Sequence, residues 1–136
     1  MPGLSDATEL LVLDSIFGDG AINLFTAPTY LALTTVAVTE TDTAATITEA
    51  NYPGYARKAL SAADMSAAVA GSKTNSAAQV FPGCTAGTST VIGWAVVFTA
   101  SGAGTVILFG TCTSTTVSVT QTPPQVAAGV LIANLD

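Results

Sequence analysis

The sequence predicts a mainly β protein, an antiparallel β-sandwich or barrel of about seven strands with one N-terminal α-helix. Three observations support this fold class. Short runs rich in Val, Thr, Leu and aromatic residues recur from about residue 29 to residue 135, with Gly and Pro between them. Two of these runs flank the Gly-rich segment "TASGAG", which is typical of a β-hairpin. The first segment instead repeats its apolar residues at helical spacing.

The predicted helix covers about residues 6–17. Asp6 is expected at the N-cap with Glu9 three residues later, as in a capping box, and Gly18 supplies a C-terminal stop. A helix at this terminus is expected to dock on a neighbouring subunit or to cover the end of its own sheet. The apolar stripe that would make this contact comprises the interface candidates Leu10, Leu13 and Phe17.

The rest of the chain, after "GDG", is expected to form strands. The polar, acidic stretch 40–52 is expected to be a long surface loop, and 61–76 is either a loop or a poor helix. Neither an internal repeat nor a second domain is evident, so residues 1–136 are expected to form a single β-sandwich domain. The expected strands are 29–38, 55–60, 77–81, 91–98, 105–113, 115–120 and 129–135.

Composition narrows the possible partners. The net charge is −6 and only 9% of the residues are charged, which argues against binding to nucleic acid or to an anionic membrane. No apolar run reaches the roughly 18–20 residues that a membrane span needs. With 49% hydrophobic residues and few charges, the surface must consist largely of Thr, Ser, Ala and Gly. Such a surface favours a homo-oligomer or another assembly component over a free monomer.

The sequence offers few residues for catalysis. It contains no histidine, which removes the commonest general base and metal ligand. Cys84 and Cys112 lack zinc-type spacing and are expected to be two reduced thiols, with a single disulfide as the alternative. Carboxylates such as Glu40 and Asp42 match no calcium loop and are interpreted as solvated. We therefore expect no catalytic residues, no metal site and no cofactor.

Trp94 is the single tryptophan and lies within a predicted strand. Strand periodicity places Ile92, Val96 and Phe98 on the same face, which favours a role as a core anchor. The alternative is an exposed ring that stacks on a sugar.

The segment "GYARKAL" (54–60) holds two of the three basic side chains of the protein, Arg57 and Lys58. In a strand they would point to opposite sides of the sheet, with Tyr55 on the face of Arg57. A desolvated Arg needs a carboxylate or several carbonyl partners. Either Glu49 of the same chain supplies it, or an acidic group of a neighbouring copy does, so Arg57 and Glu49 are further interface candidates.

The order of segments resembles a group of small virion structural proteins of tailed bacteriophages, the head decoration and tail-fibre-like proteins. The resemblance spans nearly the whole chain and depends on "LSDATELLVLDSIFG", "PTYLALTT", "GYARKAL", "NSAAQVFP", "GTSTVIGWAVVFTASGAGTVILFGTCT" and "AAGVLIANLD". It implies a β-domain displayed on a virion, without enzymatic activity. The two cysteines and the acidic loop before Tyr52 depart from that pattern.

Three functions follow as expectations. The first is a capsid decoration (cement) protein, which stabilises the head by oligomeric packing on the major capsid protein. The second is a tail fibre or tail-tip protein that contacts the host surface. The third is a small carbohydrate-binding module, which exposed aromatic rings at Tyr30, Tyr52, Tyr55 or Trp94 would favour.

Overall fold

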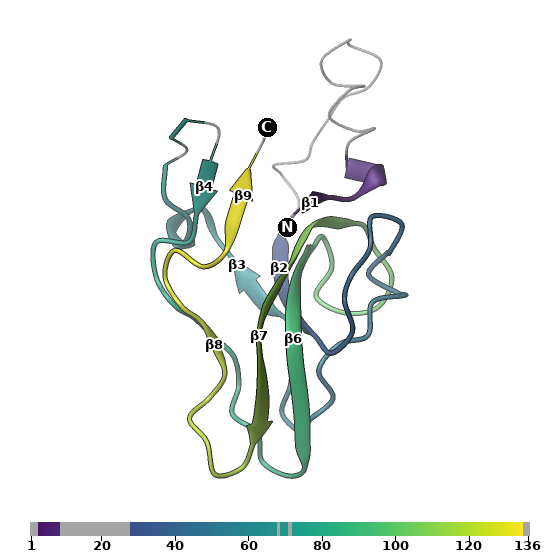
Figure 1. The fold of residues 1–136 in the computed structure, drawn as a ribbon, viewed down its shortest axis with the longest axis vertical. Coiled ribbons are helices and arrows are strands. Elements are labelled where there is room, and N and C mark those ends of the chain that lie inside the picture. Colours follow the sequence, from purple (N-terminus) through teal and green to yellow (C-terminus); the bar gives the residue numbers. More distant parts are fainter. Residues whose placement is uncertain (1–2, 9–27, 68, 71, 135–136) are drawn as a thin grey trace.

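The structure is a computed structural model that describes residues 3–8, 28–67, 69–70 and 72–134 (Figure 1). These residues form nine β-strands, the start of a helix at residues 6–8 and one 3-10 helix, η1 (Ala62–Asp64). The predicted fold class, mainly β with antiparallel pairing, is confirmed. The strands are β1 (Gly3–Leu4), β2 (Thr29–Thr34), β3 (Lys58–Leu60), β4 (Ser72–Thr74), β5 (Gln79–Val80), β6 (Thr88–Val97), β7 (Val106–Ser118), β8 (Gln125–Val126) and β9 (Ile132–Asn134).

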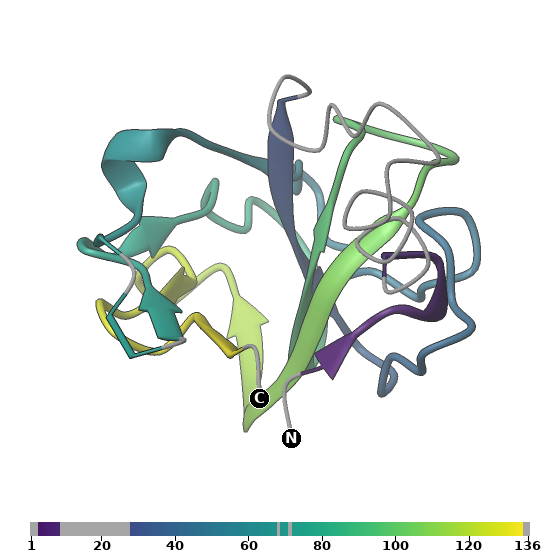
Figure 2. The ribbon, with the colours of Figure 1, turned by 90° about the horizontal axis from the view of Figure 1, so that it is seen from above.

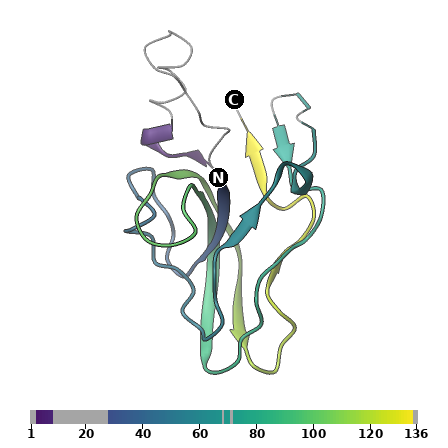
Figure 3. The ribbon, with the colours of Figure 1, turned by 180° about the vertical axis from the view of Figure 1, so that it is seen from behind.

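The strands make one large sheet and two small ones. The large sheet has the order β1-β7-β6-β2-β3, and β4 pairs with β9 and β5 with β8. Viewed from above, both small sheets lie on one side of the large sheet (Figure 2). Figures 1 and 3 show β3 between β2 and the β4–β9 pair, so this strand leads from the large sheet toward the small one.

The β6–β7 hairpin is the longest element and confirms the predicted turn at "TASGAG". The two strands expected at 105–113 and 115–120 are one strand, β7, because the Thr-rich run between them holds no Gly or Pro to end it. Most other strands are shorter than expected. The segment expected as strand 55–60 is paired only at β3, because the turn at Gly54, with φ of +96°, precedes it.

The two stretches without predicted strands also differ from expectation. Residues 40–52 contain no strand but are not a purely surface loop, because Ala44, Ile47, Ala50 and Tyr52 are buried against the sheet. Within 61–76, the structure contains η1 and β4 in place of a loop or a poor helix.

The N-terminal segment begins as a helix at residues 6–8. The N-cap is Ser5 and not Asp6, because the Thr8 backbone N–H donates to Ser5 Oγ over 3.3 Å. Ser5 Oγ and Thr8 Oγ1 both donate to the carbonyl of Val106, which attaches the helix start to β7. The remainder of the expected helix, with Leu10, Leu13 and Phe17, lies outside the described residues. Within the described part of the chain, no helix has the length and apolar character needed to cross a membrane.

Trp94 is a core anchor, as predicted, with 2% of its surface exposed. Its expected neighbours change because β6 and β7 shift register between the pairs Val91–Thr115 and Gly93–Thr111. This bulge places Val91, and not Ile92, in the buried cluster with Trp94. Phe98, beyond the end of β6, is also absent from that cluster and is half-exposed.

The indole of Trp94 packs directly on Gly110 of β7, its partner across the strand pair. A Cβ added at Gly110 would lie 2.6 Å from Trp94 Cζ2, closer than packed carbon atoms approach. We therefore expect Gly110→Ala to lower the free energy of unfolding by about 1–3 kcal/mol, through overpacking around a fixed ring. Denaturant unfolding measures the change. Gly83→Ala is the control, because its Cβ would meet Pro123 at an ordinary 3.7 Å; equal effects of the two variants would contradict the packing argument.

Candidate functional site

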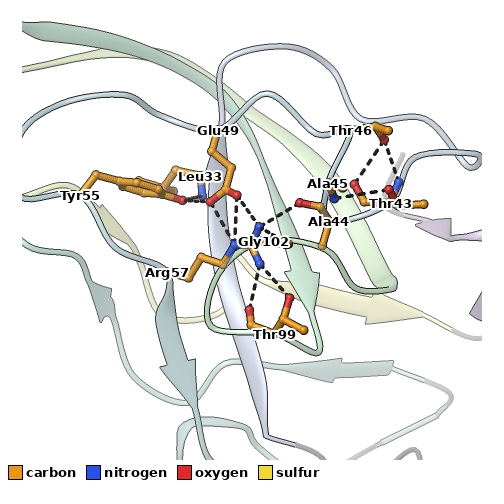
Figure 4. A network of polar contacts seen from close by, with 10 residues as sticks. All are labelled: Leu33, Thr43, Ala44, Ala45, Thr46, Glu49, Tyr55, Arg57, Thr99 and Gly102. Carbon is orange, nitrogen blue, oxygen red and sulfur yellow. Dashed lines mark hydrogen bonds and ion pairs between the residues drawn. The ribbon is translucent and has the colours of Figure 1, made fainter.

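Arg57 forms the centre of a buried polar network (Figure 4). Its side chain is 3% exposed, and that of its partner Glu49 is 20% exposed. Arg57 Nε donates to Glu49 Oε1 over 3.0 Å, and Nη2 donates to the same oxygen over 2.5 Å. The ion pair within the chain, one of the two alternatives left open by the sequence, is therefore the one that the structure contains.

The remaining guanidinium N–H groups bind two other segments of the chain. Nη1 donates to the backbone carbonyl and to Oγ1 of Thr99, at 3.0 and 2.9 Å. Nη2 also donates to the carbonyls of Ala44, at 2.9 Å, and Gly102, at 3.3 Å. One side chain thus connects the 44–49 loop to the turn of the β6–β7 hairpin. The planar fork of arginine suits this role, since a lysine has a single nitrogen to share among these acceptors.

Tyr55 extends the network to the large sheet. Its hydroxyl donates to Glu49 Oε2 over 2.7 Å and accepts a hydrogen bond from the backbone N–H of Leu33 over 3.1 Å. Because β3 pairs with β2 only as far as Leu31, the Tyr55 hydroxyl supplies the acceptor that a longer β3 would have offered to Leu33. Burial, and next the hydrogen bond to Glu49, raise the pKa of Tyr55 far above its ordinary value, so the hydroxyl remains a donor.

We expect Tyr55→Phe to lower the free energy of unfolding by roughly 1–3 kcal/mol, since it leaves the buried N–H of Leu33 without this acceptor. Equilibrium unfolding in urea measures the loss. Tyr30→Phe is the matched control, because the Tyr30 hydroxyl has no hydrogen bond to any residue that the structure describes. Identical unfolding midpoints for wild type and Tyr55→Phe would show that the hydroxyl has no structural role.

A second set of hydrogen bonds shapes the loop that presents Glu49. Asp42 Oδ2 accepts a bond from the backbone N–H of Thr39 over 2.8 Å, and Oδ1 accepts one from Thr46 Oγ1 over 2.8 Å. The Thr39 N–H is the main cause of a lowered pKa at Asp42. The pKa of Asp42 in the folded state therefore lies below its value in the unfolded state. The ionised carboxylate stabilises the fold at pH values above the ordinary Asp pKa, and this contribution is lost as the pH falls through the lowered pKa. The hydrogen bonds of Asp42 thus stabilise the loop itself.

An apolar pocket of about 280 Å³ lies between β7 and the segment that contains β8. Its walls include Trp94, Val117 and Val126, and Cys112 contributes a half-buried thiol. Burial raises the pKa of Cys112, which disfavours the reactive thiolate. Cys84 is buried in the core cluster against which Cys112 packs, and the two cysteines are free thiols, as predicted. The part of the chain described here contains no group of three acidic or Cys side chains placed to hold a metal ion.

None of the four rings named for sugar binding is fully exposed, because Tyr52 and Trp94 are buried and Tyr30 and Tyr55 are half-buried. Tyr52 is 3% exposed, and its hydroxyl donates to the carbonyl of Pro82 over 3.0 Å. Tyr55 packs edge-on against Tyr52 and stacks on Phe81, with ring centroids 5.5 and 6.3 Å apart. With Trp94 buried as well, these rings cannot stack on a sugar as the carbohydrate-binding alternative requires.

Of the predicted interface residues, Leu10, Leu13 and Phe17 lie outside the described residues, so the structure places only Arg57 and Glu49. Arg57 and Glu49 are brought together, while Lys58 makes no ion pair with any described residue. Whether Arg57 or Glu49 also contacts another subunit stays a prediction. Sequence reasoning missed Thr99 and Gly102, and no residue pattern could have indicated them, because they contribute mainly backbone carbonyls from a distant turn.

Comparison with known proteins places the chain in a family. No curated protein matches the chain. A family model described as "Podophage GP4 fiber I protein gp80" matches residues 3–134, which include all nine strands and the whole Arg57 network. Since the match covers nearly the entire sequence, the chain belongs to this family of phage virion structural proteins.

Proposed function

We propose that this protein is a non-enzymatic structural component of a podophage tail fibre, which acts by assembling with copies of itself and with other virion proteins. The observation that carries the proposal is the family match over residues 3–134, whose description names a fibre protein. The match favours the tail-fibre alternative over the capsid decoration role that we expected first from the sequence.

The polar network supports a mechanical role. Arg57, Glu49 and Tyr55 direct their polar atoms toward one another and toward backbone groups of this chain. The buried charge of Arg57 thereby connects loops that are far apart in sequence, which resists their separation. We infer that such internal cross-links help a fibre subunit to keep its fold under load.

The composition supports assembly in either location on the particle. A surface with few charges suits extensive contact with other subunits, whether these belong to a fibre or to a shell. Capsid decoration, with the major capsid protein as partner, therefore remains the alternative outcome of the experiment that tests the proposal.

The experiment is localisation of the protein on intact virions. An affinity-purified antibody against the recombinant chain, followed by gold labelling and electron microscopy, should label the tail fibres. Particles produced without the gene should lack a fibre or a fibre segment and should keep a complete capsid shell. Label distributed over the capsid, together with normal fibres on the deletion particles, would refute the tail-fibre proposal in favour of decoration.

A further inference from the structure

The charged residues are confined to one part of the sequence. All nine acidic and all three basic residues lie in residues 1–73 or at Asp136, so the chain from Thr74 to Leu135 carries no charged side chain. This uncharged stretch includes β5 to β9, and with them most of the large sheet. Soluble domains ordinarily distribute charges of both signs over the surface, whereas the centres of protein interfaces are depleted in charge.

Within this stretch, the start of β6 and the end of β7 form one end of the molecule, at the bottom of Figure 1. We call this surface the uncharged end and define it by its exposed residues Thr88, Thr90, Thr115, Thr116 and Val119. Side chains of a strand alternate between its two faces, yet residues 113–116 are all exposed. Residues 113–116 are thus exposed on both faces of β7, although Thr115 also lines the apolar pocket and Val117, on the same face, is buried.

The end of β7 also offers an open strand edge. On its outer side, β7 pairs with β1 at Leu108 and Phe109. After the bulge that follows Thr111, residues 115–118 pair with β6 alone among the described strands. An open edge exposes backbone N–H and C=O groups, and natural proteins protect such edges with charged residues or proline. Residues 115–118, with the sequence "TTVS", contain neither.

Apolar side chains are exposed beside this edge. Val119 follows β7 directly and is 55% exposed, and Val130, on the wall of the apolar pocket, is 46% exposed. A charged partner would find no complementary group here, and a sugar would find no exposed aromatic ring among the described residues. A second copy of the same chain fits, because two uncharged surfaces can meet without the repulsion expected between chains of net charge −6.

We propose that the uncharged end binds the same end of a second copy, with residues 115–118 of the two β7 strands paired edge to edge. The contact is isologous, so each residue near the symmetry axis meets its own counterpart. The backbone groups of the open edge, apart from the Ser118 carbonyl that already accepts a bond from the Gln121 N–H, then form hydrogen bonds across the interface, and Val119 is covered. This inference deepens the proposed function, since it names the surface through which the fibre protein would associate with itself.

The test introduces charge at Thr116, whose hydroxyl lies 3.3 Å from that of Thr90 on the exposed ribbon. Thr116→Glu and Thr116→Lys should each weaken self-association at least about tenfold, because like charges then face each other across the axis. An equimolar mixture of the two variants should associate again, because opposite charges meet. Sedimentation velocity of the full chain measures the self-association of each variant and of the mixture. Circular dichroism checks that each variant is folded.

Ala37→Glu is the matched control, since it adds the same charge at an exposed position in the charged part of the chain and should leave association unchanged. A wild-type chain that is monomeric up to about 100 μM overturns the proposal. A Thr116→Glu variant that associates like wild type also overturns the proposal, whatever its effect on the binding of virions to host cells. Neither result depends on where the antibody labels the virion. Label on the capsid would refute the tail-fibre proposal without affecting the self-association result, so the two proposals can fail separately.

Discussion

Arg57→Ala is expected to lower the free energy of unfolding by roughly 3–5 kcal/mol, the cost of breaking a buried ion pair by removing one partner. After the substitution, the Tyr55 hydroxyl is the only group of this network that still donates a hydrogen bond to the Glu49 carboxylate. It also leaves the carbonyls of Ala44 and Thr99 without their guanidinium donor. The 44–49 loop and the hairpin turn then lose their connection, so the effect should exceed that of a single hydrogen bond.

Denaturant unfolding of the free variants provides the measurement. Lys58→Ala is the neighbouring control and should change stability by about 0.5 kcal/mol or less, because Lys58 forms no ion pair within the described chain. Arg57→Lys should recover only part of the loss, since it keeps the charge but not the planar fork. If Lys58→Ala proves more damaging than Arg57→Ala, the importance assigned to the network is wrong.

Occupancy on virions separates the internal role of Arg57 from the interface role that the sequence also suggested. Lost stability of the free protein would assign Arg57 to the ion pair within the chain. Normal stability with lost incorporation into particles would instead assign it to a contact between subunits.

Trp94→Ala is expected to have a comparable effect, a loss of about 3–5 kcal/mol, because it removes the only tryptophan from the centre of the core. The ring fills the space above Gly110, and its removal would extend the neighbouring apolar pocket into the core. The surroundings cannot easily close over the gap, since β6 and β7 are held at their spacing by the strand ladder.

The free energy of unfolding of Trp94→Ala, measured by circular dichroism, tests this expectation. Val36→Ala is the control for loss of an apolar side chain at an exposed position, because Val36 is 54% exposed, and it should shift stability by about 0.5 kcal/mol or less. A Trp94→Ala variant as stable as wild type would contradict a core role for the ring.

The hairpin was predictable from local chemistry, whereas the neighbours of Trp94 were not. β-Branched runs on both sides of a Gly-rich turn determine a hairpin wherever it lies in a fold. The bulge between Val91 and Gly93 depends on how β7 bends to meet the rest of the sheet. Between these pairs β7 contributes two more residues than β6, and this irregularity changes which side chains face the core. Val91 therefore replaced Ile92 beside Trp94 through a feature that strand periodicity does not contain.

By itself, the sequence determined the mainly β class. It also favoured free thiols and a buried tryptophan over their alternatives, and it offered the pairing of Arg57 with Glu49 as one of two alternatives. These follow from residue type and spacing, because burial, turn formation and the need of a buried charge for a partner are local requirements. The tertiary structure alone showed that Arg57 and Glu49 meet within the chain, since the distance between them depends on how the 44–49 loop folds against the sheet. It also decided that Tyr55 caps Leu33 and that β7 ends in an open edge, because both depend on where neighbouring strands stop pairing, which is set by packing between segments distant in sequence.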